Sequence, residues 1–166
     1  MYTDNMSIFS EIGVREGKDR IGEEFLYNLA CCYSHAEHAL EKPLARHGLS
    51  PVKMNALLLI KHVGKDRGLS QQDLARRMIV SAGNVTRLVD RLEKEQLIVR
   101  KQGPDRRVKW IVATPKASRL LDRVWPIYKK KVDEIASFIS NDLPNGVRIL
   151  NDFRVKLSKD IAKETT

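Results

Sequence analysis

The feature that most restricts the fold is a pair of short helical patterns separated by a tight turn near the middle of the chain. The first begins at Ser70 with Ser-Gln-Gln-Asp, an N-capping sequence in which Asp stands where Glu or Gln is usual, and it covers residues 71–78. After a three-residue turn, Ser81 is the expected N-cap of a second helix. Its apolar side chains lie at i, i+3, i+4 and i+7: Val85, Leu88, Val89 and Leu92. This arrangement predicts a helix-turn-helix.

A β-hairpin is expected directly after these helices. Residues 97–101 and 108–113 have the composition of strands, and residues 102–105 between them supply the Gly and Pro of a turn. A long helix over residues 115–140 follows, capped by Thr114 and Pro115, and Pro126 inside it must kink or break it. The expected fold class is therefore mainly α with a small β-hairpin wing.

Amphipathic helices flank this central part. Residues 21–46 carry an apolar stripe in steps of three and four. A short apolar helix follows, with Ser50 as its N-cap and Pro51 at its first position. Residues 1–20 have no sustained period and predict a loose or weakly helical extension. A last amphipathic helix carries the stripe Val147, Leu150, Phe153, Leu157 and Ile161.

Positive charge is concentrated in the centre of the chain. The formal net charge is +9, and residues 70–113 hold ten basic and five acidic side chains, whereas residues 1–69 hold nine of each. A basic centre predicts a polyanionic partner such as nucleic acid. A basic surface that serves only solubility would have the same composition, so charge alone does not decide.

The polar side of the second central helix has the composition of a DNA-reading surface. Small residues let a helix approach the major groove closely, Asn can pair with adenine, and Arg can pair with guanine. The free N–H groups of the first turn also favour a phosphate. A solvated helix face that happens to carry Arg and Asn is the alternative. The residues on this side near the helix start are Ser81, Ala82, Gly83, Asn84, Thr86 and Arg87.

The tip of the expected hairpin carries Asp105, Arg106 and Arg107. A cationic wing beside a helix-turn-helix can reach the adjacent minor groove, where an inserted Arg reads groove width and negative potential. Asp105 would then orient one of the two guanidinium groups. A polar hairpin turn without a ligand is the alternative.

Four segments of the chain resemble the MarR family of winged-helix transcriptional regulators. They are residues 69–75, the Val-Thr-Arg-Leu-Val-Asp-Arg-Leu-Glu run at 85–93, residues 97–100, and Asp-Arg-Arg at 105–107. Gln96 departs from the family, which commonly ends this helix with Gly. The resemblance implies a homodimer that binds a pseudo-palindromic operator, usually as a repressor. In the family, small molecules often bind between the dimer interface and the DNA-binding lobe, so an effector is an expected partner.

The resemblance also implies a division of the chain. Residues 1–20 would be the loose extension, residues 21–48 and 115–166 the N- and C-terminal dimerisation helices, and residues 49–114 the winged helix-turn-helix that binds DNA. The flanking helices carry more apolar stripe than a winged helix of this size can bury, which independently favours a partner surface. The residues assigned to DNA are Ser70, Gln71, Ser81, Ala82, Gly83, Asn84, Thr86, Arg87, Arg91, Asp105, Arg106 and Arg107.

The sequence therefore predicts a regulator that binds double-stranded DNA sequence-specifically, and a nonspecific architectural DNA binder is one alternative. A metal- or redox-responsive regulator is the other, since Cys31, His35 and His38 lie at i, i+4 and i+7 and could hold zinc with a fourth ligand from a partner helix. The sequence places no such fourth ligand, so we expect no metal and no cofactor.

Several classes of protein are not expected. The chain has no phosphate-binding glycine loop, zinc-protease helix or nucleophile elbow, which argues against an enzyme. No apolar run approaches the roughly 20 residues that a bilayer requires. The N-terminal residues lack the apolar stretch of a signal peptide. Two adjacent cysteines cannot form a disulfide framework, and we expect a cytoplasmic protein.

Overall fold

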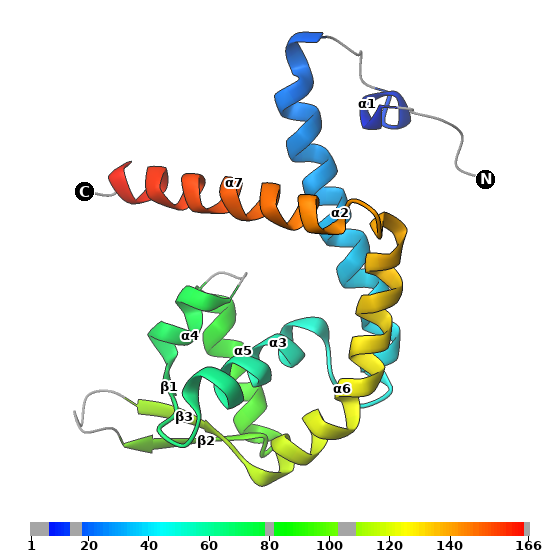
Figure 1. Cartoon of the computed structure of the whole chain (residues 1–166). Helices are drawn as coiled ribbons and strands as arrows, with labels where there is room; N and C mark the ends of the chain where they lie inside the picture. The colour runs from blue at the N-terminus through cyan, green and yellow to red at the C-terminus, as the bar shows by residue number, and fades with distance from the viewer. Residues whose placement is uncertain (1–6, 14–17, 79–81, 103–108, 165–166) are drawn as a thin grey trace. The chain divides into compact units, whose positions relative to one another are not determined.

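A computed structural model of the chain describes residues 7–13, 18–78, 82–102 and 109–164, which form two compact units, Met1–Tyr128 and Lys129–Thr166 (Figure 1). The elements of the first unit are α1 (Ile8–Glu11), a 3-10 turn (Lys18–Arg20), α2 (Ile21–Ala45), α3 (Pro51–Leu59), a π-helical turn (Ile60–Gly64), β1 (Leu69–Ser70), α4 (Gln71–Arg77), α5 (Ala82–Lys94), β2 (Ile98–Gln102), β3 (Lys109–Ala113) and most of α6 (Pro115–Ala136). A 3-10 turn (Ser137–Ile139) and α7 (Leu143–Glu164) follow the end of α6 in the second unit.

The core of the first unit lies between α3, α4, α5, the strands and the first half of α6. Its fully buried side chains come from all of these elements: Met54, Leu57, Ile60, Leu74, Val85, Val89, Leu92, Ile98, Ile111 and Val124. Apolar burial is the main favourable term in folding, and it fixes which side of each amphipathic helix faces inward. The predicted mainly helical winged fold is confirmed.

The described strands form a three-stranded antiparallel sheet in the order β1-β3-β2. β2 and β3 pair with each other as the predicted hairpin, and Arg100 lies opposite Ile111. The sequence analysis did not anticipate β1, in which Leu69 pairs with the same Ile111. Gly68 permits this pairing, because its φ is +89° and a Cβ atom there would lie 2.8 Å from the carbonyl oxygen of Ile111.

The helix starts follow the predicted caps. The side chains of Ser50 and Ser70 accept hydrogen bonds from the backbone N–H groups three residues on, and Thr114 does the same for Ala117 at 3.2 Å. α6 is continuous through Pro126, so the break considered from the sequence does not occur. A proline removes one hydrogen bond from the helix, and the buried Val124 holds this stretch against the core.

The N-terminal extension contains a packed anchor. Phe9 of α1 is only 2% exposed, and its ring meets that of Tyr27 edge-on at 6.1 Å between centroids. The guanidinium carbon of Arg20 lies 4.5 Å from the centroid of the Phe9 ring. The extension is therefore weakly helical at α1, where one aromatic side chain contacts partners on the following turn and helix.

The second unit consists mainly of α7, which begins with Leu143 and holds Pro144 in its first turn, where no N–H is required. Its predicted apolar stripe is largely exposed, with Val147, Leu150, Leu157 and Ile161 each about half accessible. No helix among the described residues is both long and apolar enough to cross a membrane.

Candidate nucleic-acid interface

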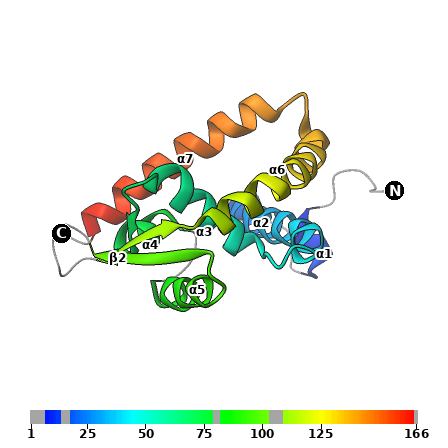
Figure 2. The same ribbon diagram turned by 90° about the horizontal axis from the view of Figure 1, so that it is seen from below.

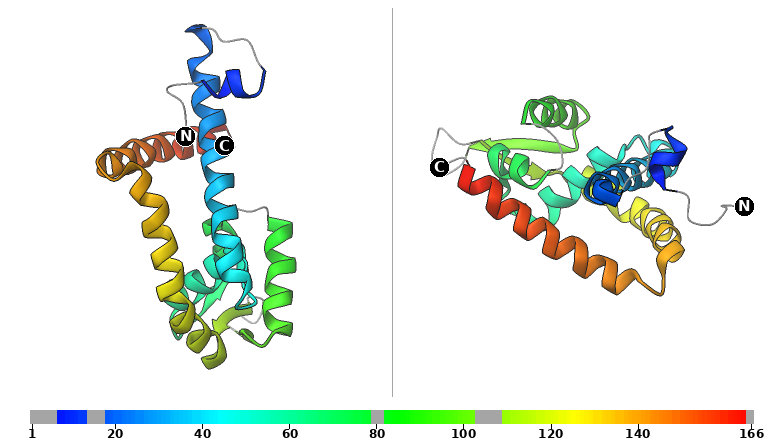
Figure 3. Two further views of the ribbon diagram at one scale, coloured as in Figure 1. Left: turned by 90° about the vertical axis from the view of Figure 1, so that its right-hand side faces the viewer. Right: turned by 90° about the horizontal axis from the view of Figure 1, so that it is seen from above.

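Helix α5 lies on an outer edge of the first unit, beside the sheet (Figure 2; Figure 3). Val85, Val89 and Leu92 on its inner side are fully buried. Its outer side is solvent-exposed over its whole length, as the sequence predicted: Gly83, Asn84, Thr86, Arg87, Asp90, Arg91 and Lys94. A helix held in this way presents a rigid, hydrogen-bonding face to a large ligand.

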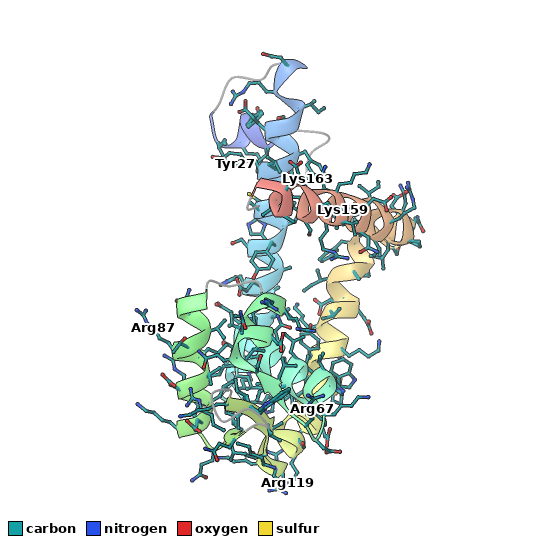
Figure 4. The ribbon with its side chains drawn as sticks, turned by 90° about the vertical axis from the view of Figure 1, so that its left-hand side faces the viewer. Tyr27, Arg67, Arg87, Arg119, Lys159 and Lys163 are labelled. Atoms are coloured by element: carbon teal, nitrogen blue, oxygen red, sulfur yellow. The ribbon has the colours of Figure 1, made fainter. Side chains whose placement is uncertain are left out.

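The first two turns of this face are open. A Cβ atom added at Gly83 would meet no atom within 4 Å. Arg87 extends outward from α5, away from the rest of its unit (Figure 4). No carboxylate of the described residues pairs with Arg87 or Arg91, so both guanidinium groups keep their donors for a ligand.

Two residues assigned to DNA backbone contacts also have internal partners. The Ser70 hydroxyl accepts from the backbone N–H of Asp73 at 3.0 Å and lies 2.8 Å from the Asp73 carboxylate, to which it donates. This is the predicted cap with Asp as its acidic member. Gln71 donates from Nε2 to Oγ1 of Thr86 at 2.9 Å and so links the start of α4 to α5.

Arg100 on β2 ties the sheet to the C-terminal half of α5. Its Nη2 donates to Asp90 at 2.5 Å and its Nη1 donates to Glu93. Partial burial acts to lower the pKa of Arg100, but the hydrogen bonds and the charges of both carboxylates outweigh this effect, so the pKa is raised. The sequence analysis did not anticipate this cluster, since its members lie seven and ten residues apart on two elements.

The C-terminal end of α5 is held by other long-range contacts. The buried Lys53 of α3 donates to both carboxylate oxygens of Glu95, at 2.6 and 2.7 Å. Lys116 donates to the Glu95 carbonyl at 2.8 Å. Gln96 adopts a left-handed conformation with φ +59°, and the N–H of Leu97 reaches back to the carbonyl of Leu92, which completes a Schellman cap. Gln96 thus ends α5 at the position where the family commonly has Gly, and its backbone adopts a left-handed conformation that is strained for a residue with a side chain.

Further cations lie near this surface. Arg76 and Arg77 of α4 are exposed, and their Nη1 atoms lie 3.9 and 3.8 Å from the Asp73 carboxylate. The guanidinium carbon of Arg67 lies 4.8 Å from the centroid of the Trp110 ring. Trp110 on β3 therefore packs against a side chain of the same unit. The sequence analysis did not name the α4 pairs, although the spacing of Asp73 three and four residues before two Arg is a signal that could have found them.

The other residues predicted to contact DNA lie at the start of α5 or outside the described part of the chain. Ala82 is the first residue of α5. Ser81 and the tip residues Asp105, Arg106 and Arg107 lie outside the described residues.

The residues considered for a metal lie along α2. Cys31 is half-buried, His35 and His38 are exposed, and His38 lies 3.2 Å from Glu41 on the same helix. Among the described residues, no three His, Cys, Asp or Glu side chains are placed to hold a metal ion.

A cavity of about 260 Å³ lies between elements of the first unit. Its walls include Tyr33 and Glu37 of α2, Val52 and Met54 of α3, Met78 after α4, and Tyr128 of α6. Of the described residues that line it, Glu37 alone carries a charge. The lining of the cavity is therefore mostly apolar and aromatic, which is the usual composition of a small-molecule site.

Comparison with known proteins gives consistent results. A family model described as MarR family matches residues 47–108. The chain is 32% identical over 115 residues to the HTH-type transcriptional regulator MhqR of Bacillus subtilis (strain 168). The matched region makes up 69% of this chain and 77% of that protein. The fold of this chain is similar to that of AbsC, a MarR family transcriptional regulator from Streptomyces coelicolor, with a TM-score of 0.71 and 21% identity. The match covers 90% of this chain and 99% of AbsC. The fold is also similar to that of MepR in the S. aureus MepR-DNA complex, with a TM-score of 0.68, 19% identity, and coverage of 81% and 97%.

Proposed function

Because this chain belongs to the MarR family of transcriptional regulators, we propose that it binds double-stranded DNA sequence-specifically, with α5 in the major groove. The observation that carries the proposal is that one side of α5 is buried and apolar whereas the other is exposed and polar. Its inner side is locked into the core, whereas Gly83, Asn84 and Arg87 point outward in a row of small and hydrogen-bonding residues. The S. aureus relative with the same fold forms a complex with DNA.

The other contacts follow from this placement. Arg91 would bind a phosphate or a base edge one turn after Arg87, and Ser81, Ala82 and Thr86 would contribute at the start of the helix. Ser70 and Gln71 would contact the backbone. Arg106 and Arg107 would enter the neighbouring minor groove, with Asp105 orienting Arg107.

We infer that the active form is a homodimer that binds a pseudo-palindromic operator as a repressor. The half-exposed apolar side chains of α7 support this inference, as do Leu26 and Tyr33 on α2, because exposed stripes of this kind usually mark a partner surface. Sedimentation should give a dimer at micromolar concentration. A monomer that binds operator DNA with full affinity would contradict the inference.

We further propose that a small apolar effector releases the protein from DNA by binding in the cavity. Met78 lines the cavity and directly precedes the connection to α5, and Val52 and Met54 flank Lys53, which bonds Glu95 after α5. A screen of small aromatic compounds by melting temperature tests this proposal. Ala36 of α2 also lines the cavity, so Ala36→Trp, which would fill it, should abolish any shift that the wild type shows.

Selection of bound duplexes from a random pool, followed by titration against unselected duplex over a range of salt, tests the function itself. A sequence-specific regulator keeps an affinity ratio of about 10³ or more, whereas an architectural binder shows the salt dependence with little preference. Arg87→Ala should reduce the preference by about 1–3 kcal/mol with folding intact. Arg119→Ala, which removes the same charge from α6 (Figure 4), is the matched control and should leave the preference unchanged.

A further inference from the structure

We propose that Arg100 is a positioning residue for DNA recognition that acts through Asp90 and Glu93 and does not itself contact DNA. It neutralises carboxylates on the DNA-facing helix and fixes the orientation of that helix relative to the sheet. This inference rests on the proposed function of α5.

The argument begins with the location of Asp90. It lies three residues after Arg87 near the centre of the outer side of α5, and its side chain is 52% exposed. Glu93 follows one turn later and is 40% exposed. Two carboxylates on a helix that approaches phosphates are unfavourable, since like charges at an interface repel each other and oppose association.

Arg100 offsets this repulsion from behind. Its side chain is 20% exposed, and each of its two terminal nitrogens donates to one of the carboxylates. The cluster carries one net negative charge with Arg100 and two without it. Because both nitrogens are already committed within the fold, Arg100 is poorly placed to bind a phosphate as well.

The same contacts set geometry. Arg100 lies in the middle of β2 opposite the buried Ile111 of β3, so its backbone position is fixed by the sheet. A planar guanidinium that bridges two acceptors on successive turns of α5 restrains rotation and sliding of that helix against the sheet. A small misplacement of a reading helix affects every base contact that it makes.

The test is a mutant cycle in the full-length protein, with a duplex selected by the wild type as the probe. In the wild-type background, Arg100→Met should weaken binding about tenfold or more, because it unmasks both carboxylates. In a background that carries Asp90→Ala and Glu93→Ala, the same substitution should weaken binding less than about twofold, since neither a charge nor a hydrogen-bond acceptor is left for Arg100. Circular dichroism and melting curves establish that each variant is folded at the assay temperature.

Any other outcome of this mutant cycle overturns the proposal. Equal losses in the two backgrounds would mean that Arg100 contacts DNA directly. An unchanged affinity with a lowered melting temperature would mean that its role is structural only. Should Arg100→Met fail to fold, Arg100→Gln, which also removes the charge, enters the same cycle and is judged by the same comparison. Failure of the proposed function is distinguishable, because the wild type would then show no preference for any selected duplex.

Discussion

The substitution Gly83→Ala separates stability from recognition. Gly83 is the second residue of α5, it is exposed, and a Cβ atom there would meet nothing within 4 Å. Alanine is favoured over glycine in helices by about 0.5–1 kcal/mol, mainly because glycine loses more backbone entropy on folding. The free energy of unfolding should therefore rise by up to about 1 kcal/mol.

The same methyl group should weaken DNA binding. If the first turn of α5 lies against the edge of the duplex, the added methyl occupies space that DNA would fill. Overpacking a closely fitted contact costs about 1–3 kcal/mol, which corresponds to roughly 5- to 150-fold in affinity. A variant that is more stable in isolation and yet binds DNA more weakly cannot be explained by damage to the fold.

Gly22→Ala is the matched control. Gly22 is likewise the second residue of a long helix, is exposed, and has open space around the position of a Cβ atom. Urea denaturation and fluorescence anisotropy on a selected duplex measure the two quantities for both variants, and sedimentation checks the oligomeric state. Gly22→Ala should gain similar stability and bind DNA as the wild type does. Unchanged DNA affinity in Gly83→Ala would refute the close approach of this helix turn.

Three further predictions concern other parts of the molecule. Gln96→Gly should raise the free energy of unfolding by about 1 kcal/mol, since glycine adopts the left-handed conformation without strain, while Gln96→Ala should give no such gain. Lys53→Met should lower it by about 1–3 kcal/mol through loss of charged hydrogen bonds from a buried position. Lys129→Met, which breaks an exposed pair, should cost less than about 1 kcal/mol, and equal costs would argue against the distinction. Arg107→Ala should weaken binding most on A·T-rich flanks; a loss that does not vary with flank sequence would count against minor-groove insertion.

Local signals in the sequence predicted most of the elements. The caps at Ser50, Ser70 and Thr114 act within three residues, and the apolar spacing of α5 repeats within one helix. Such features depend on neighbours along the chain, so they can be recognised without a structure. The outer face of α5, which is central to the proposed function, follows from the inner one by helix geometry alone.

The features that were not predicted depend on residues far apart in the sequence. β1 has only two residues and exists because Leu69 meets Ile111 across more than forty positions. The strain at Gln96 was foreseeable as a departure from the family, but the conformation that the residue would adopt was not. Ser81 and the wing tip lie outside the described residues, so their predicted contacts with DNA stay predictions.

The orientation of α5 depends on the same long-range contacts. Apolar packing determines which side of the helix faces inward, but packing alone tolerates small rotations because it is not directional. Polar links at three points along α5 remove that freedom: Gln71 bonds Thr86, Arg100 bonds Asp90 and Glu93 in the C-terminal half, and Lys53 bonds Glu95 just after the helix. Each link comes from a different element, so a displacement of α3 beside the cavity would be passed to the end of α5 while the sheet holds the turn before it. On this reasoning, specificity for DNA depends on charged groups behind the reading helix as much as on those in front of it.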